Sequence, residues 1–297
     1  MCDRVILAID SSDESRRAAR TGIELAGILD VPIEVVHVLE RSLLDALRSS
    51  GDRDQIRGER RELLAEVESM AKDRGIESTS KLLEGRPADR IESVATERSD
   101  PVIVLGRQGR SSISRRVLGG VTERVLGSAV APVLVEPGDG PDEPTLPPSA
   151  ILVPTDGSEN AERAFEQVAE LAGETGARVH VLSVLDLQQS GGVFDAGGLD
   201  PEFVNRQEEV SRNAVESGRE RLLALDPSIE VSTDLERSSD FDGVSGVIAS
   251  YADSRDIDLI VMGSHGRSNV KRQVLGSVTA TVIRSVNVPV LVVPREV

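Results

Sequence analysis

The sequence predicts an α/β protein built from two tandem doubly wound domains, each with a five-stranded parallel sheet. Short apolar runs rich in β-branched residues alternate with helical patterns five times in each half. The halves also repeat one another: the apolar run ending at Asp10 aligns with the run ending at Asp156, and a Gly-x2-Gly-x9-Gly loop occurs once in each half. Residues 138–149 (GDGPDEPTLPPS) are Pro-rich and acidic and lack periodicity, as a linker does. We therefore expect domains at residues 1–137 and 150–297.

In the first half, the strand patterns are short and almost wholly apolar, as expected for central parallel strands. They cover residues 4–9, 31–38, 76–83, 102–105 and 132–136. Asp10-Ser11-Ser12 supplies turn and N-cap chemistry for an amphipathic helix that runs to about Ile28. A long polar helix follows with Leu63, Leu64, Val67 and Met70 at helical spacing, and Gly85-Arg86-Pro87 opens a third helix to about Arg98.

The second half repeats this order. Strands are expected at 150–155, 177–184, 229–235, 258–262 and 289–293, and helices at 158–174, 201–225, 243–254 and 277–286. A Gly-rich insert at 188–199 (QQSGGVFDAGGL) is expected to be either a lid or a simple loop.

Composition limits the classes of function. The formal net charge of -17 argues against a general nucleic-acid or anionic-membrane surface, and no apolar run approaches membrane-spanning length. A single cysteine, Cys2, excludes an intrachain disulfide, and this and the absence of a signal peptide fit a reducing cytoplasm. The three histidines and Cys2 lie far apart and form no zinc pattern. Low lysine and aromatic content with many carboxylates favours a halophile over an acidic protein from a GC-rich genome.

The segment from Gly263 to Ser277 (GSHGRSNVKRQVLGS) is typical of a phosphate-binding loop. It joins a strand to a helix start, where backbone N–H groups and the helix dipole favour an anion. Gly263 and Gly266 are expected to permit positive φ and close approach of a ligand, and Arg267, Lys271 and Arg272 add positive charge. No carboxylate occurs from residue 263 to residue 295. The alternative is an ordinary strand–helix connection whose cations pair with acidic neighbours.

The first half repeats the spacing with Gly106, Gly109 and Gly119 and carries the cations Arg107, Arg110, Arg115 and Arg116, but Gly120 occupies the position of Ser277. Because the carboxyl ends of parallel strands meet at one edge, Asp156 and Val184 are expected beside the second loop. Asp10 and Val38 are their counterparts beside the first. A helix N-cap is the alternative role for each aspartate.

These motifs resemble the universal stress protein family in its tandem form, over nearly the whole chain. The resemblance implies an adenine-nucleotide alpha hydrolase-like fold and an ATP site in the second half. Family likeness assigns the nucleoside to Pro154, Asp156, Val184 and Met262, beside Thr155, and the phosphates to Gly263, Gly266, Gly276, Ser277 and Val278, beside His265 and Arg267. The first site is expected to be weaker because the hydroxyl of Ser277 is missing at Gly120.

The resemblance also implies pairing through fifth strands, either within one chain or in a homodimer. The leading function is ATP binding by a stress-response sensor or regulator. No GxxxxGK[ST] loop and no Ser/His/Asp or Cys/His set is apparent, so catalytic residues and a protein metal site are not expected. Two alternatives stay open: a slow ATPase or phosphotransferase with Mg²⁺ held mainly by phosphate oxygens, and a nucleotide-free scaffold.

Overall fold

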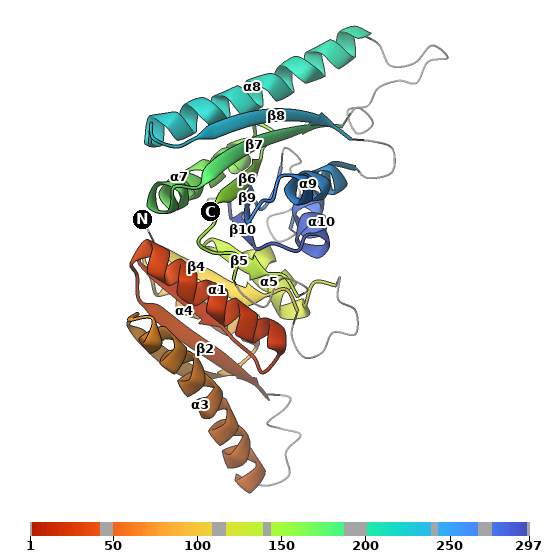
Figure 1. Cartoon of the computed structure of the whole chain (residues 1–297). Coiled ribbons are helices and arrows are strands. Elements are labelled where there is room, and N and C mark those ends of the chain that lie inside the picture. The colour runs from red at the N-terminus through yellow and green to blue at the C-terminus, as the bar shows by residue number, and fades with distance from the viewer. Residues whose placement is uncertain are drawn as a thin grey trace, which may run out of the picture. The chain divides into compact units, whose positions relative to one another are not determined.

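The computed structural model describes residues 2–41, 50–108, 117–138, 144–186, 201–238, 243–266 and 275–295. The chain divides into two compact units, with the boundary between Pro147 and Pro148. Helices and strands alternate along both units (Figure 1). In the described ranges, no helix combines the length and the apolar character needed to cross a membrane.

The first unit is a five-stranded parallel sheet covered on both faces, as predicted. Its strands are β1 (Arg4–Ala8), β2 (Ile33–Glu40), β3 (Ser78–Gly85), β4 (Pro101–Gly106) and β5 (Val133–Glu136). Its helices are α1 (Asp13–Leu29), α3 (Ser50–Asp73), α4 (Pro87–Thr96) and α5 (Gly120–Ser128). The strand order is β3-β2-β1-β4-β5, and every pair is parallel.

The second unit has the corresponding order β8-β7-β6-β9-β10, again with parallel pairs. Its strands are β6 (Ala150–Pro154), β7 (Arg178–Leu185), β8 (Val231–Arg237), β9 (Leu259–Gly263) and β10 (Val290–Val293). Its helices are α6 (Glu159–Glu162), α7 (Ala164–Thr175), α8 (Pro201–Leu225), α9 (Gly243–Ser254) and α10 (Ser277–Ser285). The single helix expected at 158–174 is thus divided in two. Arg163, between them, keeps helical dihedral angles, so the hydrogen-bonding pattern changes while the backbone stays helical.

The two faces of each sheet are covered by different helices (Figure 1). In the first unit, α1 packs on β1, β4 and β5 and α3 on β2 and β3, while α4 packs on β2, β3 and β4 and contacts α5. Ser12 starts α1, since its hydroxyl accepts a hydrogen bond from the Ser15 N–H at 3.2 Å. The apolar face of α1 is buried against strands whose central residues are almost wholly inaccessible to water. Burial of this face, rather than helix propensity, fixes the helix on the sheet.

The strand order places a switch point in each unit. In the first, β1 lies between β2 and β4, with Leu7 aligned to both Val35 and Val104. The chain therefore leaves β1 and β4 in neighbouring positions at the carboxyl edge, where α/β proteins bind ligands. In the second unit β6 lies between β7 and β9 in the same way. Asp10 and Asp156 thus follow the same strand of their unit, and the two glycine loops follow β4 and β9.

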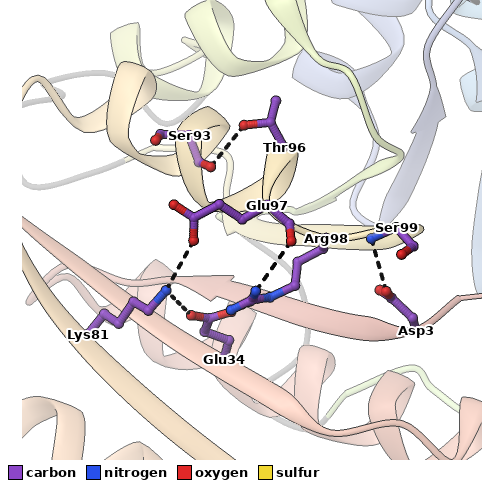
Figure 2. A network of polar contacts seen from close by, with 8 residues as sticks. All are labelled: Asp3, Glu34, Lys81, Ser93, Thr96, Glu97, Arg98 and Ser99. Atoms are coloured by element: carbon purple, nitrogen blue, oxygen red, sulfur yellow. Dashed lines mark hydrogen bonds and ion pairs between the residues drawn. The ribbon is translucent and has the colours of Figure 1, made fainter.

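A buried ion cluster distinguishes the first sheet from the second. Glu34, on β2, is 1% exposed, and its carboxylate lies 2.7 Å from Lys81 Nζ and 2.6 Å from Arg98 Nη2. Figure 2 shows both cations converging on it. Burial would raise the pKa of Glu34, but hydrogen bonds from Lys81 and Arg98 outweigh it and hold the pKa below its usual value. The repeat places His180 at the position of Glu34, where its Nδ1 lies 3.1 Å from the Tyr251 hydroxyl.

Candidate functional site

A cavity of about 1590 Å³ opens at the carboxyl edge of the first sheet. It is the space where the sequence predicts the first nucleotide site. Among the predicted first-site residues, Asp10, Val38, Gly106, Gly119 and Gly120 line it. Gly109 lies outside the described residues. The structure therefore brings together every predicted first-site residue that it describes.

The internal repeat shows which residues of the second half correspond to the residues that line this cavity. Residues of the first two strands correspond at an offset of 146, and those of the glycine loops at an offset of 157. Ten of the predicted second-site residues have counterparts that line the cavity. These counterparts are Ala8, Ile9, Asp10, Val38, Leu105, Gly106, Gln108, Gly119, Gly120 and Val121, and they correspond in this order to Pro154, Thr155, Asp156, Val184, Met262, Gly263, His265, Gly276, Ser277 and Val278. Of the predicted second-site residues, only Gly266 and Arg267 have counterparts outside the described ranges. Arg267 itself lies outside them too.

Both glycine loops are closed by the same two hydrogen bonds. In the first loop, the Gly119 N–H donates to Arg107 O at 2.9 Å, and Thr122 Oγ1 donates to Gly106 O at 2.8 Å. In the second, the Gly276 N–H donates to Ser264 O at 2.9 Å, and Thr279 Oγ1 donates to Gly263 O at 3.0 Å. These bonds hold the start of the helix against the end of the strand. Sequence reasoning did not identify the two threonines, although the Val-Thr pair is present after both loops.

The second loop needs glycine for a reason different from the predicted one. Neither Gly263 nor Gly266 has a positive φ; both are closely packed, Gly263 against backbone and Gly266 against a side-chain oxygen. A Cβ on Gly263 would lie 2.7 Å from the backbone oxygen of Asn160, and one on Gly266 would lie 2.6 Å from Asp156 Oδ2. The expectation of positive φ was therefore wrong. The glycines instead let the loop approach the first turn of the helix that follows β6, and with it the Asp156 carboxylate.

Asn160 is a second residue that sequence reasoning missed. It is 5% exposed, and its Nδ2 donates to His265 O at 2.6 Å. This bond fixes the middle of the second loop to the helix after β6. A polar residue at the second position of that helix is a weak signal, because first turns commonly carry such residues.

The helices that follow the two glycine loops start in the same way. The N-caps are Gly119 and Gly276, and Gly120 and Ser277 are the first helical residues. Ser277 is exposed at the helix start, so its hydroxyl is accessible to a ligand but is not the cap. A Cβ added at Gly120 would meet nothing within 4 Å. The two positions therefore differ by the hydroxymethyl side chain of serine, at the same place in the two helices.

Both aspartates bind the turn after their strand, and neither takes the alternative role of helix N-cap. Asp10 Oδ1 accepts from the Ser12 N–H at 2.8 Å, and Asp156 Oδ1 accepts from the Ser158 N–H at 3.0 Å. In each case the helix N-cap is the serine, not the aspartate. One carboxylate oxygen of each aspartate is thus used to shape the turn.

The histidines near the two sites are buried. His37 lines the first cavity at 6% exposure, and its Nδ1 lies 2.8 Å from Ile9 O. A carbonyl oxygen only accepts, so Nδ1 carries the proton and Nε2 remains an acceptor. Burial lowers the pKa of His37, and the charge of Arg60 lowers it further. In the second loop His265 is 7% exposed, and its Nδ1 lies 3.0 Å from Ser264 Oγ.

Arg107 does not supply charge to the first cavity. It is 1% exposed and is not among the residues that line the cavity. Its backbone N–H donates to Glu136 O at 2.8 Å, which continues the hydrogen bonding between β4 and β5. The Glu136 side chain is also buried and accepts from Thr21 Oγ1 at 2.8 Å. Burial raises the pKa of Glu136 to about 7, against the opposing effects of Thr21 and Arg17.

Several other sequence-based expectations cannot be compared with the structure. The Gly-rich insert at 188–199 and the cations Arg110, Arg115, Arg116, Lys271 and Arg272 lie outside the described residues. Within the described ranges, no group of three or more His, Cys, Asp or Glu side chains could hold a metal ion.

Comparison with known proteins identifies the family of this fold and these loops. A family model described as the universal stress protein family matches residues 1–137 and 149–294. A universal stress protein of Mycobacterium tuberculosis is 28% identical over 308 residues, covering 97% of this chain and 96% of that protein. A universal stress protein structure from Archaeoglobus fulgidus has a TM-score of 0.70 at 24% identity, covering 99% of this chain and 97% of the other.

The solved members of the family include a nucleotide complex. A universal stress protein in complex with cAMP is 21% identical, with a TM-score of 0.36, and covers 50% of this chain and 97% of its own. The two family matches follow one another along the chain, and each contains one of the glycine loops. The chain therefore belongs to the universal stress protein family, in the tandem form with two family domains.

Proposed function

We propose that this protein binds ATP and acts as a nucleotide-dependent sensor or regulator in a stress response, with its principal ATP site at the second glycine loop. The observation that carries the proposal is the correspondence between halves. Ten of the twelve predicted second-site residues have counterparts that line one cavity at the switch point of the first unit. The predicted second-site residues lie on the strands and the glycine loop that correspond to those around this cavity. In the second half the Gly-x2-Gly-x9-Gly motif is also followed by Ser277, so it is complete.

The proposed binding mode follows from the chemistry of these positions. The backbone at Gly276, Ser277 and Val278 opens α10 and would hold phosphates, because a helix N-terminus favours anions. The Ser277 hydroxyl would donate to a phosphate oxygen. Asp156 would accept hydrogen bonds from the ribose or base, and Pro154, Thr155, Val184 and Met262 would surround the nucleoside. Mg²⁺, if bound with ATP, would be held mainly by phosphate oxygens.

The second half is proposed to bind ATP more tightly than the first. A hydrogen bond to a charged phosphate contributes about 1.5–3 kcal/mol, which is about ten- to a hundredfold in affinity. Gly120 lacks this donor, although its backbone N–H is retained. The difference depends on one hydroxyl, so it can be tested by exchanging two residues.

Titration calorimetry with ATP on the full chain tests the proposal. The unmodified protein is expected to show one tight site and a weaker one. Ser277→Gly should reduce the tight site to the level of the weaker, and Gly120→Ser should strengthen the weaker, since the space around Gly120 is open. Thr281→Ala is the matched control, because Thr281 lies one turn further along α10 and its hydroxyl donates to Ser277 O within the helix. Two equal sites, or no response to Ser277→Gly, would show that the Ser277 hydroxyl does not set the difference in ATP affinity.

A further inference from the structure

The first cavity extends well beyond the positions that correspond to the ATP motif. Its lining continues from the end of β2 to the end of β3 and the first turn of α4. At about 1590 Å³ it exceeds the roughly 300–1,000 Å³ that most small-molecule sites occupy. A nucleotide held at the glycine loop would therefore leave part of the cavity to be filled by something else.

Positive residues outnumber carboxylates in the lining of the cavity, whereas carboxylates outnumber positive residues in the whole chain. The whole cavity lining contains five arginines and three carboxylates, in a chain with 34 Lys and Arg and 51 Asp and Glu. The arginines are Arg41, Arg60, Arg86, Arg90 and Arg124. They come from β2, α3, α4 and α5 and the turns beside them, so four separate segments direct cations to one cavity.

Three of these five arginines form no ion pair and no side-chain hydrogen bond with the residues that the structure describes. These three are Arg60, Arg86 and Arg124. Arg90 donates through Nε to Glu84 O at 2.9 Å, which positions its guanidinium beside the start of α4. By contrast Arg57, also on α3, is paired with Glu84 at 2.8 Å and does not line the cavity. Unpaired cations around a cavity favour an anionic ligand.

The start of α4 adds to this preference. Arg86 is the N-cap of α4, with no side-chain capping bond, and Pro87 follows it. The positive end of the α4 dipole thus faces the same cavity as that of α5, whose first residues Gly120 and Val121 also line it. Between the two helix starts the floor is apolar, with Ile9, Val36 and Leu105. His37, at 6% exposure, adds an acceptor nitrogen to this floor.

The second half lacks the corresponding cations. At the offset of 157 that aligns the glycine loops, Arg86 corresponds to Gly243, Arg90 to Val247 and Arg124 to Thr281. The basic region is therefore specific to the half whose ATP motif is incomplete. The glycine at position 120 and the three arginines thus occur in the same unit.

We infer that the first unit holds a second phosphate subsite at Arg86, Arg90 and Arg124, and that its ligand is a nucleotide bearing phosphate at two separate positions. One phosphate would lie at the start of α5 and the other at the start of α4, with the nucleoside over the apolar floor. The inference rests on the proposed nucleotide binding for the first phosphate only. The second phosphate would be recognised by the arginines, which the family motif does not contain.

Two probes that differ by one phosphate test the subsite: AMP and adenosine 3′,5′-bisphosphate, titrated calorimetrically into the full chain. The bisphosphate is expected to bind at least tenfold more tightly. Arg86→Gln and Arg124→Gln should each lower bisphosphate affinity more than AMP affinity, so that this ratio falls toward one. Arg57→Gln, the control, removes the same charge from a residue outside the cavity and should leave the ratio unchanged.

A second measurement separates the subsite from nucleotide binding in general. Inorganic triphosphate carries no nucleoside, and it should raise the melting temperature of the unmodified protein more than that of Arg86→Gln. A ratio near one in the unmodified protein while ATP still binds would overturn the subsite and leave the proposed function intact. Absence of ATP binding, with triphosphate still stabilising in an Arg86-dependent way, would overturn the proposed function and retain the subsite. Equal effects of Arg57→Gln and Arg86→Gln would also overturn the subsite.

Discussion

Replacing Glu136 with glutamine should change how the stability of the protein depends on pH. Glu136 is 4% exposed, its carboxylate accepts a hydrogen bond from Thr21 at 2.8 Å, and burial raises its pKa from 4.5 to about 7. The folded state therefore holds the Glu136 proton more tightly than the unfolded state does. Stability falls as pH rises from about 4.5 to about 7, because ionisation in the folded protein places a charge in a buried site.

The size of the effect follows from the two pKa values. Each pKa unit corresponds to 1.36 kcal/mol, so the carboxylate lowers the free energy of unfolding by up to about 3 kcal/mol above pH 7. In Glu136→Gln the side-chain amide would keep an acceptor for Thr21 and cannot ionise. The difference in unfolding free energy between this variant and the unmodified protein should thus grow in favour of the variant across this range.

Urea unfolding followed by circular dichroism at several pH values between 4.5 and 8 measures this difference. Glu62→Gln is the matched control, because it makes the same substitution at an exposed position on α3. A pH-independent difference for Glu136→Gln would refute the argument, since it would mean that Glu136 titrates alike in the folded and unfolded states.

Three further outcomes are expected. Gly263→Ala should destabilise the protein by about 1–3 kcal/mol in urea unfolding, because its Cβ would lie 2.7 Å from a backbone oxygen, whereas Gly120→Ala should be nearly neutral; equal losses would contradict the packing argument. The melting temperature should rise between 0.01 and 1 M potassium chloride, because salt screens a net charge of -17; a flat curve would count against the halophile interpretation. A separately produced second half, residues 149–297, should self-associate through its apolar fifth strand, and a strictly monomeric half in analytical ultracentrifugation would place the pairing surface elsewhere.

Most of the fold was predictable because its signals are local and repeated. Nearly continuous apolar runs separated by helical patterns identify buried parallel strands, and the repeat allows each half to support the other. The boundaries shifted by one or two residues; β2, for example, is Ile33–Glu40 rather than 31–38. Such shifts are expected, because strand ends are set by hydrogen-bond register, which the apolar pattern does not encode.

The candidate site was predicted in its motif positions but not in its surroundings. The role of Gly266 could not be derived from spacing, because it depends on the packing of this glycine beside Asp156, 110 residues earlier in the chain, where an added Cβ would lie 2.6 Å from Oδ2. Arg107 was expected to provide surface charge, but it is buried beside β5. Arg86 and Arg124 were not among the binding-site residues predicted from the sequence. Their convergence is a tertiary property of separate helices, and single arginines in an arginine-rich sequence carry no signal of it.

The central claim is that this universal stress protein binds ATP, and the most direct test is the identity of the small molecule that accompanies it. The protein should be purified in its full length under native conditions, denatured, and the released compounds analysed by chromatography and mass spectrometry. The account predicts an adenine nucleotide in the unmodified protein and a reduced amount in Ser277→Gly. Absence of any nucleotide, together with no rise in melting temperature on adding ATP, would contradict the claim and favour the nucleotide-free scaffold.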